Sequence, residues 1–134
     1  MSVKNLYLFA AAAILGCAPA SGSGVIPGVH RNAKVLTSAE IEAAHADVRT
    51  AYEAISRLRP NWLASHGAMS SDAGANPFAT VWMDGQLLGE LSALREIPAF
   101  QVADLRYYDV TEAGGKFGLR AGSGGAIEVR SRVR

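Results

Sequence analysis

The sequence contains a single cysteine, Cys17, and its surroundings restrict the chemistry open to it. An apolar run over residues 6–15 precedes it, after one positive charge at Lys4. That run is shorter than the roughly 20 apolar residues of a transmembrane helix and has the length typical of the hydrophobic part of an export signal. A lone cysteine in an exported protein has no intramolecular disulfide partner, so its thiol is available for covalent modification.

The four residues Ile14-Leu15-Gly16-Cys17 resemble the lipobox of bacterial lipoproteins. The resemblance implies a signal peptide over residues 1–16, cleavage between Gly16 and Cys17, and diacylglycerol on the Cys17 sulfur. Two or three acyl chains make a stable anchor, whereas one is marginal. Ala18 stands where an aspartate would favour retention in the inner membrane, so the resemblance implies an anchor in the outer membrane that faces the periplasm. Membrane lipid, contacted through acylated Cys17, is the first expected partner.

A second candidate for chemistry is Ser123, in the run Ala121-Gly122-Ser123-Gly124-Gly125. This run is one residue short of a nucleophile elbow, which needs glycines two before and two after the serine. The predicted order here is helix, loop and strand, which reverses the strand-turn-helix context of that motif. A small anchored serine hydrolase is therefore an alternative function, and a turn serine is the simpler interpretation.

Three arginines alternate at the C-terminal end: Arg130, Arg132 and Arg134. Arginine forks match phosphate oxygens, so these residues are candidates for contact with a partner or with anionic lipid or glycan. This gives a third alternative, a passive envelope-structural protein. The simpler interpretation is the polar face of a terminal strand.

The composition argues against several other classes of function. The formal net charge is +1, so no strong field attracts nucleic acid. The three histidines, His30, His45 and His66, have no metal-site spacing. We therefore expect no metal, no cofactor and no nucleic-acid partner.

The elements that would carry these residues begin after a Ser- and Gly-rich stretch, which predicts a flexible tether over residues 17–36. Thr37-Ser38-Ala39-Glu40 has the form of a capping box. Apolar residues then recur at three- and four-residue spacing from Ile41 to Leu58, which predicts one helix ending near residues 57–59, before Pro60. A short strand is also considered at Val35-Leu36.

The second half of the chain predicts short strands and turns. β-Branched and aromatic residues at 79–83 run into Asp84-Gly85, a strong turn signal, with residues 86–88 as a hairpin partner. Trp62 is expected to pack under the helix end and Trp82 on one sheet face. The loop 64–78 is the favoured place for a partner contact. The remaining predictions are a helix over 98–102, a strand over 105–110, a helix over 111–117 capped by Thr111 and a strand over 127–132 with one wet face.

The order of several short motifs over residues 38–132 resembles the latter part of the plug domain of TonB-dependent outer-membrane receptors. The motifs are Leu58-Arg59-Pro60, Met83-Asp84-Gly85, Ile97-Pro98, Phe117-Gly118 and Gly124-Gly125-Ala126-Ile127. The resemblance implies a small mixed sheet flanked by helices over residues 37–134, an α+β fold, without the receptor's barrel.

Taken together, these patterns predict an anchored envelope lipoprotein that is not an enzyme. Its domain would act as an interaction module that docks on an outer-membrane receptor, a transporter or an export machine.

Overall fold

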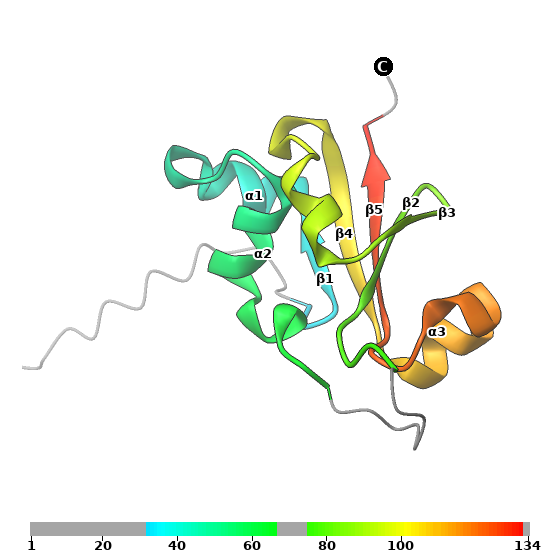
Figure 1. The fold of residues 1–134 in the computed structure, drawn as a ribbon. Helices are drawn as coiled ribbons and strands as arrows, with labels where there is room; N and C mark the ends of the chain where they lie inside the picture. Colours follow the sequence, from blue (N-terminus) through cyan, green and yellow to red (C-terminus); the bar gives the residue numbers. More distant parts are fainter. Residues whose placement is uncertain (1–31, 67–74, 133–134) are drawn as a thin grey trace, which may run out of the picture.

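The computed structural model describes residues 32–66 and 75–132, which form an α+β domain around a mixed sheet (Figure 1). The order of the five strands is β1-β4-β5-β2-β3. Only β2 and β5 are parallel, and every other neighbouring pair is antiparallel. The predicted fold class is confirmed. The strands are β1 (Val35–Thr37), β2 (Thr80–Met83), β3 (Gln86–Gly89), β4 (Val102–Tyr108) and β5 (Ala126–Ser131).

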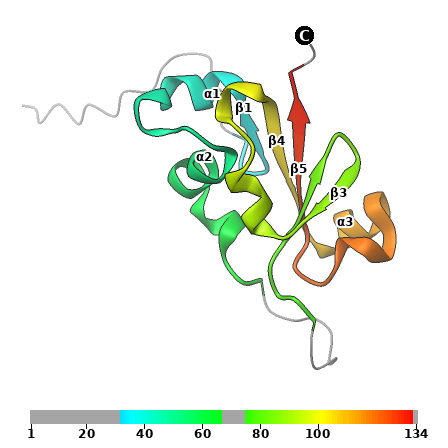
Figure 2. The same ribbon diagram turned by 45° about the horizontal axis from the view of Figure 1, so that its top comes forward.

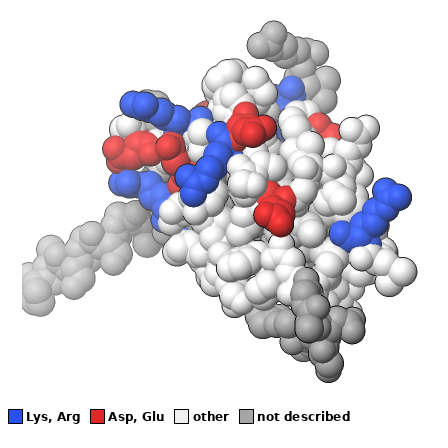
Figure 3. Space-filling model, in the orientation of Figure 1, with Lys and Arg blue, Asp and Glu red and all other residues white. Residues whose placement is uncertain are grey.

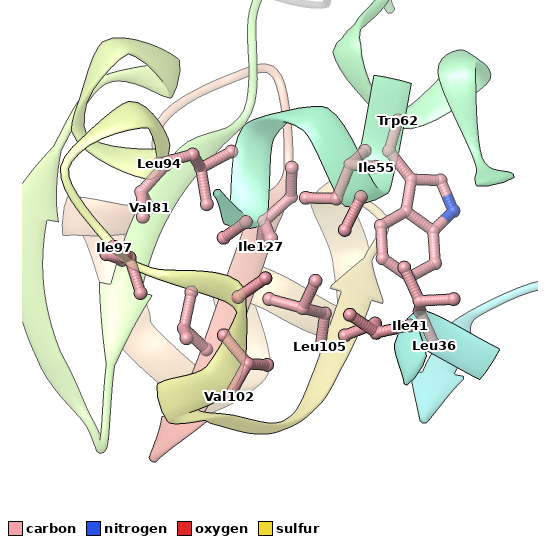
Figure 4. Close-up of a cluster of buried hydrophobic side chains, with 14 of the residues drawn as sticks. Leu36, Ile41, Ile55, Trp62, Val81, Leu94, Ile97, Val102, Leu105 and Ile127 are labelled. Atoms are coloured by element: carbon pink, nitrogen blue, oxygen red, sulfur yellow. The ribbon is translucent and has the colours of Figure 1, made fainter. Parts of the chain in front are cut away.

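Helices cover both faces of this sheet. Helices α1 (Ser38–Ala43) and α2 (Ala51–Leu58) lie on one side, and α3 (Val110–Phe117) lies on the other (Figure 2). The larger core lies under α1 and α2 (Figure 4), and its largest fully buried side chains are Trp62, Leu36, Ile55, Leu94, Leu105 and Ile127. A smaller cluster under α3 contains Trp82, Ala113, Ala121 and Ala126. Both tryptophans thus lie where the sequence predicts.

Helix α1 begins at the predicted capping box. The Thr37 hydroxyl accepts a hydrogen bond from the Glu40 amide, and the Glu40 carboxylate accepts one from the Thr37 amide at 3.0 Å. The tether predicted over residues 17–36 extends too far, because Val35 and Leu36 already belong to β1. The short strand considered at these two residues is present.

The single long helix expected after Thr37 is wrong, because the chain breaks between α1 and α2. A 3-10 turn over His45–Asp47 follows α1, and Thr50 then lies in extended geometry as the N-cap of α2. The break lets the chain pair with a distant segment. The Ala51 amide donates to the Ile97 carbonyl and the Ala99 amide to the Arg49 carbonyl, each at 2.8 Å. Helix α2 ends at Leu58, as Pro60 predicts.

The predicted hairpin is confirmed. Asp84 and Gly85 both have positive φ, 49° and 85°, which is the backbone of a two-residue type I′ turn. Strand β2 returns as β3 with Met83 opposite Gln86 and Trp82 opposite Leu87.

Two further elements differ from their predictions. Asp109, not Thr111, caps α3, because its carboxylate accepts from the Glu112 amide and Glu112 reaches back to the Asp109 amide. The helix expected over 98–102 is only a 3-10 turn, Ala99–Gln101. Pairing of Val102 with Ser131 draws the chain into β4 at that point.

Strand β5 does not have the wet face predicted for its first half. Its first four residues are all buried, and Glu128 among them is 7% exposed. The reason is its central place in the sheet, between β4 and β2, with α3 covering the face that carries Glu128. The strand becomes exposed only at Arg130.

Candidate docking edge

The two edges of the sheet, β1 and β3, differ in how their backbone groups are satisfied. An edge strand presents N–H and C=O groups that can pair with another chain, and native proteins usually block them.

Strand β1 is blocked by its own surroundings. The Val35 amide donates to the Asn32 carbonyl at 3.2 Å, and the Val35 carbonyl accepts from the Arg59 guanidinium at 3.4 Å. The Thr37 amide donates to the Glu40 carboxylate. Trp62 adds a bond from its indole N–H to the Ala33 carbonyl, just before the strand. No free pairing position is left along this edge.

Strand β3 has no such cover among the described residues. The Met83–Gln86 pair closes the two-residue turn, so the next pair, Trp82–Leu87, is a non-bonded pair of the antiparallel ladder, and the register shifts only beyond it, between Trp82 and Val81. The N–H and C=O of Leu87 therefore point away from β2. Among residues 32–66 and 75–132, no hydrogen bond from outside the sheet reaches the backbone of β3. Its side chains are also open to solvent, since Leu87 is 43% and Leu88 46% exposed.

The free edge is held in place by the turn that precedes it. The Asp84 carboxylate accepts hydrogen bonds from the Ser131 amide at 3.0 Å and from the Ser131 hydroxyl at 2.5 Å. These bonds lower the pKa of Asp84 below its ordinary value, so the carboxylate stays charged at neutral pH. The Asp84 amide also donates to the Val129 carbonyl. The hairpin is thus fixed to the end of β5 and presents β3 in one position.

Charged residues near β3 are few. The strand Gln86-Leu87-Leu88-Gly89 has no charged residue, while Asp84 lies before it and exposed Glu90 follows it. The Glu90 carboxylate has no ion-pair partner in the part of the chain that the structure describes. Figure 3 shows the charged side chains gathered mainly over α1 and α2, with few over the β2–β3 side. The edge is therefore apolar with an acidic end at Glu90, whereas the charge of Asp84 at the other end is partly offset by Arg130 nearby.

Polar residues on the α3 side of the sheet form hydrogen bonds with one another. The Lys116 ammonium lies 2.7 Å from both the Glu128 carboxylate and the Tyr108 hydroxyl, and that hydroxyl donates to Glu128 at 2.9 Å. Burial lowers the pKa of Lys116, but the bonds to Glu128 and Tyr108 outweigh it and raise the pKa above its ordinary value. This cluster fastens α3 to the sheet, and each of its three polar groups is bonded to the other two.

A shallow depression beside α3 is lined by Lys34, Arg106, Tyr108 and Glu112, among others. Its two cations are already paired. Lys34 bonds to Asp109 and Glu112, and Arg106 lies 2.9 Å from Asp104. The depression therefore offers no unpaired charge to an anionic ligand.

The structure does not bring the predicted arginines together. Arg130 lies 3.4 Å from the Asp104 carboxylate on β4, whereas Arg132 pairs with Glu42 on α1 and donates to the Val102 carbonyl. Each guanidinium thus already has a carboxylate partner, on a different element. Arg134 lies outside the described residues.

The other predicted positions are placed only in part. Ser123 lies between the 3-10 turn Gly118–Ala121 and β5, and its hydroxyl donates to the Asn76 carbonyl at 3.0 Å. Among the described residues no histidine or carboxylate bonds to that hydroxyl. Gly16, Cys17 and most of the loop expected to contact a partner, residues 67–74, lie outside the described part.

Sequence reasoning missed the edge as a site, although one signal was present. The run Gln86–Gly89 has no lysine, proline or other residue that commonly blocks an edge strand. That signal becomes meaningful only once the strand order places β3 at an edge.

No group of three or more potential metal ligands occurs within residues 32–66 and 75–132. No helix over the same residues is long and apolar enough to span a bilayer. Comparisons with family models, with curated proteins and with solved structures gave no match to this chain.

Proposed function

We propose that this protein is a membrane-anchored lipoprotein of the cell envelope, held through acylated Cys17, and that its domain is a non-enzymatic interaction module. The anchor is inferred from the lipobox-like run that ends at Cys17. The observation that carries the docking role is the contrast between the two sheet edges, because β1 is blocked by Arg59 and Glu40 while β3 is open.

An anchored domain with a free edge is suited to a partner in the same membrane. Confinement to one surface raises the effective concentration of two proteins, so a contact of a few backbone hydrogen bonds and two leucines is sufficient. The partner class is an outer-membrane receptor, a transporter or an export machine, as the plug-like motif order suggests. The Ser- and Gly-rich tether would let the domain reach such a partner from the lipid surface.

Site-specific photocrosslinking tests this proposal. A benzoylphenylalanine is placed at Leu88 in the full chain, and the envelope is irradiated in intact cells. The expected result is a discrete adduct with one membrane protein, because Leu88 is exposed on β3, the proposed docking edge.

The matched control carries the same group at Ser56, an exposed position on α2. It should give no such adduct. The proposal is wrong if Leu88 gives no adduct in any growth phase, or if both positions give the same adducts.

A further inference from the structure

We infer that β3 is a strand acceptor, which pairs with an extended segment of a partner protein that has an apolar centre and a lysine or arginine at its end. This inference rests on the proposed function and specifies the chemistry of the partner.

The backbone of β3 provides the pairing groups. The Leu87 N–H and C=O face outward in the plane of the sheet, toward the position that a sixth strand would occupy about 4.8 Å away. Strand addition of this kind takes its affinity from main-chain hydrogen bonds. Because the hairpin is fixed by Asp84 to Ser131, the acceptor groups need little ordering on binding.

The leucines define the centre of the partner segment. Leu87 lies on the same face as Trp82, directly opposite it, and Leu88 follows on the strand. Side chains of successive strand residues point to opposite faces, so an added strand would have to cover one leucine on each face. The segment is therefore apolar or β-branched at its centre on both faces. Other exposed apolar residues, Phe78, Phe100 and Leu119, lie outside the strands and have no free ladder beside them.

The charges disfavour a second copy of this chain as the occupant. If two copies paired antiparallel about Leu87, so that the two Leu87 residues lay opposite each other, Asp84 of each copy would lie opposite Glu90 of the other. Like charges opposite one another in a sheet are destabilising. A segment ending in lysine or arginine would instead place its cation beside Glu90, which has no cation of its own in the described residues.

The inference is tested by peptide selection. A displayed library of random octapeptides is selected for binding to the full-length protein in detergent. The expected peptides have β-branched or aliphatic centres and a basic end. At saturation, the most enriched peptide should slow hydrogen exchange in β3 at least about tenfold. N-methylation of its central amide should weaken binding at least about tenfold, because the ladder bond is lost.

A charge swap tests the acidic end. Glu90→Lys should weaken the basic-ended peptide about threefold at low salt and strengthen its glutamate-ended counterpart. Glu90 precedes the 3-10 helix Leu91–Arg95, and Glu96 is an exposed acid at the other end of that helix, so Glu96→Lys should change neither affinity.

Four results would overturn the inference: no enriched peptide, enriched peptides with acidic ends, unchanged exchange in β3, or binding indifferent to N-methylation. A dimer in sedimentation that Leu87→Lys abolishes would favour the second copy instead. If any of these four results, or the dimer, appears while the probe at Leu88 still gives its adduct in cells, the strand-acceptor inference fails and the docking function stands.

Discussion

The Arg59 guanidinium lies 2.9 Å from the Glu40 carboxylate, and this largely buried ion pair joins the end of α2 to the first turn of α1. The same guanidinium donates to the Asn32 and Val35 carbonyls, so one side chain both links two helices and blocks the β1 edge.

Replacing Arg59 should therefore destabilise the domain. Arg59→Met would leave the Glu40 carboxylate without its cation and should lower the free energy of unfolding by about 2 kcal/mol at pH 7. Urea denaturation measures this. Arg57→Met is the control, because the Arg57–Asp47 pair is exposed and its loss should change stability by no more than about 0.5 kcal/mol. Equal losses for the two variants would contradict the role given to Arg59.

The effect of Arg59→Met should depend on pH. Burial raises the pKa of Glu40, but hydrogen bonds from Thr37 and Arg59 outweigh it and leave the pKa below its ordinary value of 4.5. A lowered carboxyl pKa contributes stability that is present above 4.5 and is lost as the pH falls through the folded pKa. The difference between wild type and variant should thus narrow below about pH 4.5. A difference that stays constant down to pH 3 would argue against the ion pair as its source.

Lys116 should stabilise the attachment of α3. Lys116→Met leaves the nearly buried Glu128 carboxylate with only the Tyr108 hydroxyl, and should lower stability by about 1 kcal/mol, since the ammonium is partly exposed. Because the pKa of Lys116 is raised, this contribution is complete below the ordinary value of 10.5 and is lost as the pH rises through the folded pKa. In thermal denaturation, Lys116→Met combined with Glu128→Gln should recover part of the loss. A double variant with the summed losses of the two single variants would show that the groups do not interact.

Two glycines should respond in opposite directions to alanine. Gly114 lies inside α3 with open space where a Cβ would go, so Gly114→Ala should raise stability by about 0.5–1 kcal/mol. A Cβ at Gly124 would overlap the Phe78 carbonyl oxygen, so Gly124→Ala should cost more than about 2 kcal/mol. Chemical denaturation of the wild type and the two variants measures these changes in the free energy of unfolding. Stabilisation by both substitutions would mean that the loop before β5 does not pack as described.

The proposed anchor predicts a result that does not depend on the fold. Cys17→Ser should abolish incorporation of labelled palmitate, because the hydroxyl does not replace the thiol as the acceptor of the lipid. Ser21→Ala, a change within the tether, should leave labelling intact. Continued labelling of the Cys17→Ser protein would overturn the lipoprotein assignment.

Local signals predicted much of this fold. Thr37 and Glu40 define a helix start within four residues, and Asp84-Gly85 requires the positive φ angles of a tight hairpin. Pro60 ends α2 because its ring disfavours helical backbone geometry at the residue before it. Each of these features depends on neighbours in the chain, so the sequence is enough to find them.

The features that were missed depend on distant contacts. The break before Thr50 exists because the Ala51 amide bonds to Ile97 and the Arg49 carbonyl bonds to Ala99, far along the chain. The burial of Glu128 follows from the central place of β5. The docking edge could not be predicted for the same reason, since the same four residues in a central strand would have no free backbone.

Hydrogen exchange at β3 tests most directly the claim that this edge is the docking site. Deuterium uptake is followed by mass spectrometry in peptides spanning residues 86–90, once for the purified protein and once for intact envelope vesicles. We predict fast exchange in the purified protein and at least about tenfold slower exchange in the envelope, with peptides over β1 slow in both. Equally fast exchange at β3 in both preparations would contradict the claim.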